Sequence, residues 1–230
     1  MRKRDPSPPG DSGAASSQMR YYPVFLDLQG KPVVVIGGGR IARQKMENLL
    51  KAGANVTVVS PELNPEMAAL QSEGRFRYIE REYETGDIDG YAIVFVATDD
   101  GAINAVVTRE GRAKRIWVNA VDDPPNCDFI MPGIAQRGDL TVAVSTSGRS
   151  PAMARKMREE LEEFLTEDWV EMLELAAEVR AELRERGQAP HPDIWNAALD
   201  DDLRGLLREG YRNEAKKRLL HYLKHPVGGR

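Results

Sequence analysis

The chain has 230 residues, of which 41% are apolar, and a formal net charge of −4. This size suits one large or two small globular domains, and the apolar fraction is sufficient for a buried core. The acidic balance argues against general nucleic-acid binding, and no apolar run approaches the roughly 20 residues that span a bilayer. We therefore expect neither nucleic acid nor membrane as a partner.

The N-terminal segment MRKRDPSPPGDSGAASSQMR is charged and lacks the apolar stretch of a secretory signal, so a cytoplasmic location is expected. Residues 1–20 are rich in Pro, Ser and Gly, which predicts a flexible tail. Cys127 is the single cysteine, which excludes an internal disulfide and leaves no CxxC pair for zinc or redox chemistry.

Apolar strands alternate with helical segments from residue 21 to about residue 120. The expected strands are PVVVI, NVTVV, RFRYIE, AIVFVA and IWVNA, and the expected helices cover about residues 40–52, 65–73 and 101–114. Because strands alternating with helices form parallel sheets with right-handed crossovers, residues 21–120 are predicted to be a doubly wound α/β domain.

The rhythm changes after residue 120. The apolar runs FIMPGIAQ and LTVAVST, separated by the turn-forming RGD, predict a small β region within residues 121–149, outside the parallel sheet. Ser150 and Pro151 predict the N-cap and first residue of a helix. Amphipathic segments then run to about residue 186 and from 193 to 224, so residues 150–230 are expected to form a helical C-terminal domain.

The segment GGGRIA fits the G-x-G-x-x-G/A fingerprint of Rossmann-type dinucleotide-binding domains. Gly37 permits a tight turn, Gly39 lets the backbone approach a pyrophosphate, and Ala42 keeps helix and strand close. The motif follows a predicted strand and opens a helix, whose N-terminus favours an anion. The expected cofactor-binding residues of this motif are Gly37, Gly38, Gly39, Arg40, Ile41 and Ala42.

The end of the second predicted strand leaves the choice between NAD and NADP open. Ser60 and Pro61 stand where an acid usually holds the ribose, Glu62 comes slightly late, and no Arg is present there to meet a 2′-phosphate. Ser60 and Pro61 are still expected beside the cofactor. At the end of a later strand, Thr98 is expected near the nicotinamide, while Asp99 or Asp100 caps the next helix.

Four linked segments follow one another in unbroken order from about Tyr21 to Leu161: YYPVFLDLQGKPVVVIGGGRIARQKMENLLKAGANVTVVSPEL, VFVATDDGAIN, VNAVDDPPNCDFIMPG and VAVSTSGRSPAMARKMREEL. Together they resemble the precorrin-2 dehydrogenase and sirohydrochlorin ferrochelatase family. The resemblance implies NAD-dependent oxidation of precorrin-2 to sirohydrochlorin, followed in some members by insertion of ferrous iron to give siroheme. It also implies a homodimer formed through the small β region, and a helical part that lines the tetrapyrrole cleft.

The motif NAVDD is expected just beyond the carboxyl end of a parallel strand, where open α/β sheets bind ligands. By similarity to the family, Asp122 is the catalytic residue, and we expect it to act as the general base. The residues alone favour a simpler interpretation, in which Asp122 and Asp123 begin a turn before Pro124. With the resemblance, Asp123 keeps the turn role and Asn119 is expected near the substrate.

The loop STSGRSP combines hydroxyls, a glycine and a helix N-terminus, which favours an anion, and cations follow it along the predicted helix. Precorrin-2 is a polycarboxylate, so Ser145, Thr146, Ser147 and Arg149 are expected to bind substrate. The alternative is that Ser150 is only an N-cap and the cations are solvated. No cluster of His residues supports a permanent metal site; His191, His221 and His225 are expected at surface or packing positions.

Two alternative functions remain open from the sequence. A non-catalytic, NAD-responsive regulator built on a Rossmann dimer explains the glycine motif equally well, although it gives no reason for Asp122 or for the STSGRSP loop. A dehydrogenase without chelatase activity is the second alternative, because metal insertion leaves no separate motif here.

Overall fold

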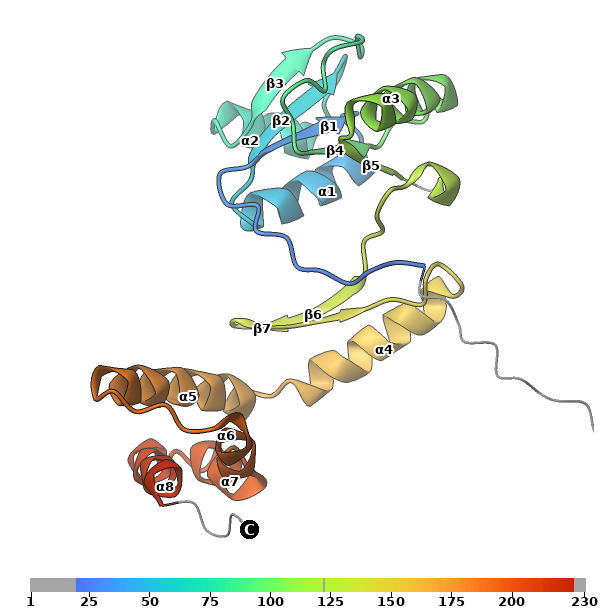
Figure 1. Cartoon of the computed structure of the whole chain (residues 1–230). Coiled ribbons are helices and arrows are strands. Elements are labelled where there is room, and N and C mark those ends of the chain that lie inside the picture. Colours follow the sequence, from blue (N-terminus) through green and yellow to red (C-terminus); the bar gives the residue numbers. More distant parts are fainter. Residues whose placement is uncertain (1–19, 122, 226–230) are drawn as a thin grey trace, which may run out of the picture. The chain divides into compact units, whose positions relative to one another are not determined.

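The computed structural model describes residues 20–121 and 123–225. The chain forms two compact units that divide between Ile130 and Met131 (Figure 1). Of the predicted tail, residues 1–19 lie outside the described residues, as does Asp122. None of the described helices is long and apolar enough to cross a membrane.

Five parallel strands of the first unit form a sheet with the order β3-β2-β1-β4-β5. The elements are β1 (Pro32–Ile36), α1 (Arg40–Lys51), β2 (Asn55–Ser60), α2 (Pro65–Ser72), β3 (Arg77–Glu80), β4 (Ile93–Val96), α3 (Gly101–Lys114) and β5 (Trp117–Ala120). The predicted doubly wound sheet is therefore confirmed, and each predicted strand and helix of this region is present.

Alternate residues of the strands point into two separate cores. Val33 and Val35 of β1 face α1 and α2, where Met46 and Met67 are fully buried. Val34 of β1 faces the opposite side, with Val107 of α3. A strand covered on both faces must be apolar at every position, which explains the unbroken run VVVI in β1.

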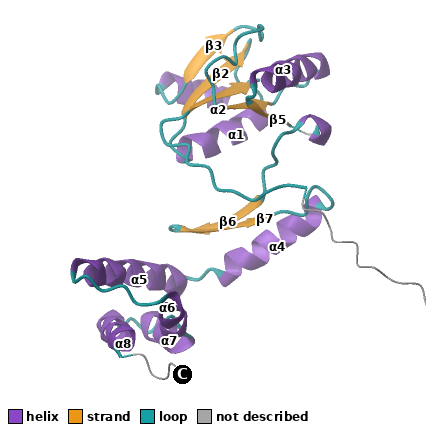
Figure 2. Ribbon diagram, in the orientation of Figure 1, coloured by secondary structure: helices purple, strands orange, loops and turns teal. Residues whose placement is uncertain are grey.

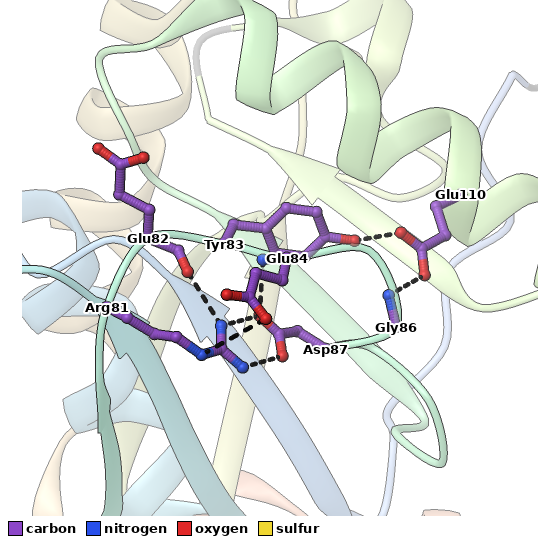
Figure 3. Close-up of polar contacts among 7 residues, drawn as sticks. All are labelled: Arg81, Glu82, Tyr83, Glu84, Gly86, Asp87 and Glu110. Atoms are coloured by element: carbon purple, nitrogen blue, oxygen red, sulfur yellow. Dashed lines mark hydrogen bonds and ion pairs between the residues drawn. The ribbon is translucent and has the colours of Figure 1, made fainter.

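The connection from β3 to β4 crosses the sheet as a loop, residues 81–92, instead of a helix. Ile88 anchors this loop in the core on the α3 side. Figure 3 shows the polar contacts that hold it: the Tyr83 hydroxyl donates to the Glu110 carboxylate of α3, and the Gly86 amide donates to the same carboxylate at 2.8 Å. Arg81 donates two hydrogen bonds of 2.6 Å to Asp87, which closes the start of the loop.

Residues 123–130, which were expected in the small β region, pack on the parallel sheet. The Asp128 amide donates to the Val118 carbonyl at 2.8 Å, and the Asp128 carboxylate accepts from the Val118 amide at 3.0 Å, so Asp128 satisfies both backbone groups of Val118 at the open edge of β5. Phe129 meets Phe95 of β4 edge-to-face, with ring centroids 5.5 Å apart. The predicted boundaries of the small β region and the helical domain remain predictions.

The second unit contains an antiparallel hairpin and a set of helices (Figure 2). They are β6 (Gly133–Arg137), β7 (Leu140–Val144), α4 (Pro151–Phe164), α5 (Glu167–Glu185), α6 (Pro192–Ala198), α7 (Asp201–Arg208) and α8 (Arg212–Lys224). The predicted cap of α4 is confirmed: the Ser150 hydroxyl accepts from the Met153 amide, and Pro151 is the first helical residue.

The helical segments expected to run to about residue 186 and from 193 to 224 each contain more than one helix. The first ends at Phe164 and restarts after Thr166, where acidic residues in the first turn favour a new helix N-terminus. The second is three helices, because the Asp200 carboxylate accepts from the Leu203 amide to cap α7, and Gly210 has a φ of +81° between α7 and α8. Helices α5 to α8 share one apolar core.

Replacing Glu110 with Gln tests how the crossover loop is held. Burial opposes ionisation of Glu110, but hydrogen bonds from Lys114, Tyr83 and Gly86 outweigh it and hold the pKa of this carboxyl below its ordinary value. The stabilisation is therefore present above the ordinary pKa of a Glu and is lost as pH falls through the lower folded value. We expect Glu110→Gln to lower the free energy of unfolding by about 1–3 kcal/mol at pH 7.

Denaturant titrations at pH 7 and pH 3 measure this effect. The difference between wild type and Glu110→Gln should shrink at pH 3, and Tyr83→Phe should reproduce part of the loss at pH 7. An equal unfolding free energy for wild type and Glu110→Gln at both pH values would contradict a role for this carboxylate in holding the loop.

Candidate cofactor and substrate site

The loops after β1 and β4 meet at the carboxyl edge of the first unit's sheet, where the strand order reverses. From β1 the chain continues into α1 on one face, and from β4 it continues into α3 on the other. Such a switch point is where open α/β sheets bind ligands. The glycine turn, Gly37 to Gly39, lies at this point.

Gly37 and Gly38 are required by the packing of the turn itself. Gly37 has a φ of +118°, and a Cβ there would lie 2.8 Å from the carbonyl carbon of Ala97, which follows β4. A Cβ on Gly38 would lie 2.7 Å from the Ser60 hydroxyl and collide with the Glu62 carbonyl, both in the loop after β2. Neither position admits a side chain, so these two glycines let three loops approach one another.

Gly39 is different, because a Cβ there would meet no atom within 4 Å. It has an ordinary φ of −81°, is exposed, and is the N-cap of α1 without any side-chain cap. No acidic residue lies in the first turn of this helix. The open space, the uncapped helix N-terminus and the lack of negative charge fit the pyrophosphate of a dinucleotide.

The other residues of the motif occupy different environments. Ala42 is fully buried in the core beneath β1, consistent with its predicted role in close packing of helix and strand. Ile41 is half-buried and Arg40 is exposed. Their contact with a cofactor remains a prediction.

Ser60 and Pro61 lie beside the glycine turn. Ser60 is buried, and its hydroxyl donates to the Glu62 carbonyl at 2.7 Å, while Pro61 is exposed. The backbone amide of Asn64 donates to the Gly38 carbonyl at 2.8 Å. The Ser60 hydroxyl therefore shapes this loop, and its predicted contact with the ribose remains untested.

Thr98 lies in the loop after β4. Its hydroxyl donates to the Asn104 side-chain oxygen at 2.8 Å and accepts from the Asp100 amide at 3.2 Å. Asp100 caps α3 by accepting from the amides of Ala102 and Ile103, so the predicted cap is Asp100 and not Asp99. Thr98 thus fixes the loop at the switch point, where it is predicted to meet the nicotinamide.

The loop after β5 is held by side chains on both sides of Asp122. Asn119 is buried, and its side-chain amide donates to the Phe129 backbone carbonyl at 2.8 Å. The Asp123 carboxylate accepts from the Asn126 side chain at 2.7 Å, so Asp123 has the predicted turn role.

The Cys127 thiol in the same loop donates to the Ala120 carbonyl at 2.9 Å, and burial raises the pKa of this thiol. Asp122 itself lies outside the described residues.

The STSGRSP loop belongs to the second unit and forms a tight turn. The Arg149 amide donates to the Thr146 carbonyl at 3.0 Å, and both residues between them have positive φ, +53° at Ser147 and +79° at Gly148. These values define a type I′ turn. The Ser145 hydroxyl accepts from the Ser147 amide at 3.0 Å, while Arg149 is exposed.

Family models match two parts of the chain. Residues 24–133 match an NAD(P)-binding family, and residues 137–163 match the family of the central part of sirohaem biosynthesis proteins. The siroheme synthase of Methylobacillus flagellatus is 38% identical over 215 residues, which cover 92% of this chain and 45% of that protein. Siroheme synthase 1 of Cronobacter sakazakii is 43% identical over 162 residues, which cover 70% of this chain and 34% of that protein.

Over these matched residues the chain is similar to siroheme synthases and precorrin-2 dehydrogenases. Among solved structures it resembles SirC, a precorrin-2 dehydrogenase, with a TM-score of 0.66 and 25% sequence identity, over 89% of this chain and 99% of that one. The chain spans less than half the length of the two siroheme synthases. The expectation of a nucleotide-binding domain is confirmed, because the NAD(P)-binding family model covers residues 24–133, which include the glycine turn and the loop after β5.

Replacing Gly39 with Asp separates cofactor binding from folding. Asp is a favourable N-cap and meets no steric obstacle at this position, so thermal stability should be unchanged or raised. The added carboxylate would stand where the pyrophosphate is expected, and we predict at least a tenfold loss of NAD affinity, about 1.4 kcal/mol, measured by calorimetry. As a control, Gly38→Ala should lower stability. Unchanged NAD affinity in Gly39→Asp would remove the turn from the cofactor site.

Proposed function

We propose that this protein oxidises precorrin-2 to sirohydrochlorin with NAD. The observation that carries the proposal is the likeness to SirC over 99% of the SirC chain. It is supported by this chain's own glycine turn, whose open N-cap fits a pyrophosphate. The bound nicotinamide would accept the hydride that leaves the substrate. This chain's own residues must hold the cofactor, accept a proton and bind the anionic groups of the substrate.

We propose Asp122 as the group that accepts the proton. Its neighbours in the chain are fixed, because the Val121 amide donates to the Val96 carbonyl at 2.9 Å and Asp123 begins the turn that follows. Asn119 joins the strand before this turn to the segment after it, so it acts as a positioning residue in addition to its predicted proximity to substrate. A carboxylate in this loop is suited to general base catalysis at neutral pH.

We propose that the STSGRSP loop binds substrate carboxylates. The loop is preformed by its type I′ turn, and the Thr146 hydroxyl accepts from the Ser150 amide at 3.2 Å, which ties the turn to the start of α4. The Arg149 side chain is exposed and therefore accessible to an anion. Guanidinium groups bind carboxylates strongly because they donate two parallel hydrogen bonds.

Insertion of ferrous iron is a second activity that we propose, since the relatives identical at 38% and 43% are siroheme synthases. Iron would be a substrate, delivered to a macrocycle whose own nitrogens bind it. Asp122 would accept the protons that these nitrogens lose. We also propose a cytoplasmic location, supported by the unpaired thiol of Cys127.

A homodimer formed through the hairpin and α4 is the last part of the proposal. Helix α4 is amphipathic and has no buried residue, although one side packs against β6, near Gly133. Met153, Met157 and Phe164 form an exposed stripe on this helix, because residues spaced by four and eleven positions return to the same side. Since a two-stranded hairpin is marginally stable alone, we infer that a second copy covers this surface.

Replacing Asp122 with Asn tests the catalytic assignment. We predict that turnover of precorrin-2 falls by roughly 10²-fold or more while NAD affinity stays within about twofold, because the carboxylate acts on the substrate's proton. Asp123→Asn keeps an oxygen for the Asn126 contact and should retain most of the turnover. Full turnover in Asp122→Asn would exclude Asp122 as the base.

Replacing Met157 with Lys tests the dimer. A charge in the apolar stripe should shift the protein from dimer to monomer in analytical ultracentrifugation. Ala152→Lys, which adds the same charge on another side of α4, should leave the dimer intact. A monomeric wild type, or a dimer unaffected by Met157→Lys, would refute this interface.

A further inference from the structure

The loops after β2 and β3 lie where the ribose of the adenosine half is expected. In doubly wound domains this ribose is recognised at the end of the second strand, and a residue there distinguishes a free 2′-hydroxyl from a 2′-phosphate. In this chain the glycine turn is fastened to that loop, because the Gly37 amide donates to the Val59 carbonyl at 2.9 Å and the Asn64 amide donates to the Gly38 carbonyl at 2.8 Å.

Glu62 is held in this loop with its side chain exposed. Its carbonyl accepts from the buried Ser60 hydroxyl at 2.7 Å, and the same carbonyl faces Gly38 so closely that no Cβ fits there. The backbone of Glu62 is therefore fixed directly against the turn that is expected to hold the pyrophosphate. Its carboxylate is free to face a ligand at this edge.

Glu80 supplies a second carboxylate at the same edge. It is the last residue of β3 and the register partner of Ser60, the last residue of β2. The Tyr78 hydroxyl donates to the Ser60 carbonyl at 3.0 Å. Burial, and then the negative charges of Glu80 and Glu62, raise the pKa of Tyr78, so both carboxylates act on this point from nearby.

Arg43 of α1 and Arg81, which directly follows β3, are already engaged by other acids. Arg43 pairs with Glu47 at 3.0 Å and with Glu66 at 2.8 Å. Arg81 follows Glu80 in sequence but points to Asp87, with two hydrogen bonds of 2.6 Å (Figure 3). Within residues 20–121 and 123–225, Glu62 and Glu80 form no ion pair.

Arg40 directly follows the glycine turn and occupies the first position of α1. At the helix N-terminus a guanidinium is suited to the pyrophosphate, which NAD and NADP share. We therefore expect Arg40 to affect both nucleotides equally and to give no preference between them.

We propose that Glu62 and Glu80 exclude a 2′-phosphate and so make this protein select NAD over NADP. The proposal rests on the proposed cofactor site and assigns the selection to two residues of the β2–β3 edge. A ribose hydroxyl can donate to a carboxylate, whereas a phosphate dianion meets two uncompensated negative charges there. The repulsion acts through solvent and weakens as salt is added.

Calorimetry with NAD and NADP tests the proposal on wild type, Glu62→Gln, Glu80→Gln and the double variant. We expect wild type to bind NAD at least about tenfold more tightly than NADP. Each substitution should narrow this ratio by about threefold, and the double variant by about tenfold, through tighter binding of NADP. Glu73→Gln is the matched control, since this exposed carboxylate lies at the far end of α2, about 12 Å along the helix from the β2 edge.

The outcomes separate this inference from the proposed function. If wild type binds NAD and the ratio does not change in the double variant, Glu62 and Glu80 do not select the cofactor, while the cofactor site itself stands. If wild type binds neither nucleotide, both the site and the selection are overturned. If the ratio of NAD affinity to NADP affinity also narrows in Glu73→Gln, the preference arises from the net charge of the protein, and a local role of Glu62 and Glu80 is contradicted.

Discussion

The close approach of three loops at the glycine turn is the constraint on which the cofactor site depends. Gly37 brings the end of β1 against Ala97 after β4, and Gly38 brings it against Glu62 after β2. Without side chains at these two positions, hydrogen bonds from Gly37 to Val59 and from Asn64 to Gly38 can form. The consequence is that Gly39, the next residue, is presented at a bare helix N-terminus with open space in front of it.

The same edge of the sheet gathers groups with different chemical tasks. The loop after β1 offers backbone amides, the loop after β2 offers a carboxylate, and the loop after β4 is fixed by Thr98 and Asn104. The loop after β5 carries Asp122 between neighbours that are tied to the sheet. Parallel strands deliver these groups to one edge because all their carboxyl ends point the same way.

Much of this arrangement could be predicted from the sequence, because the signals are local. The run VVVI, the glycine motif and the Ser150-Pro151 cap each determine an element through neighbouring residues, and the structure has each of them. The helix breaks near Leu165 and Asp200 were not predicted, although the second is marked by a local cap, in which the Asp200 carboxylate accepts from the Leu203 amide. Thr166 and Asp200 can be recognised in the sequence as N-cap residues only together with the acidic residues that follow them in the first turn of each helix.

The roles of Gly38 and Asn119 could not be predicted, because each depends on a partner distant in the chain or on the backbone of a neighbouring loop. Asn119 was expected near the substrate from its place at a strand end, yet its amide binds the carbonyl of Phe129, ten residues later. Ser60 stands where an acid is usual, and its hydroxyl instead shapes the loop that presents Glu62. For both Ser60 and Asn119, the sequence predicted the position at the end of a strand but did not predict the hydrogen-bond partner of the side chain.

An anaerobic assay of the purified wild-type protein with enzymatically generated precorrin-2 and NAD tests the central claim most directly. The account predicts that NADH and the sirohydrochlorin spectrum appear together, in equal amounts, and only when protein, precorrin-2 and NAD are all present. Binding of NAD without conversion of precorrin-2 would contradict the dehydrogenase and favour an NAD-responsive regulator.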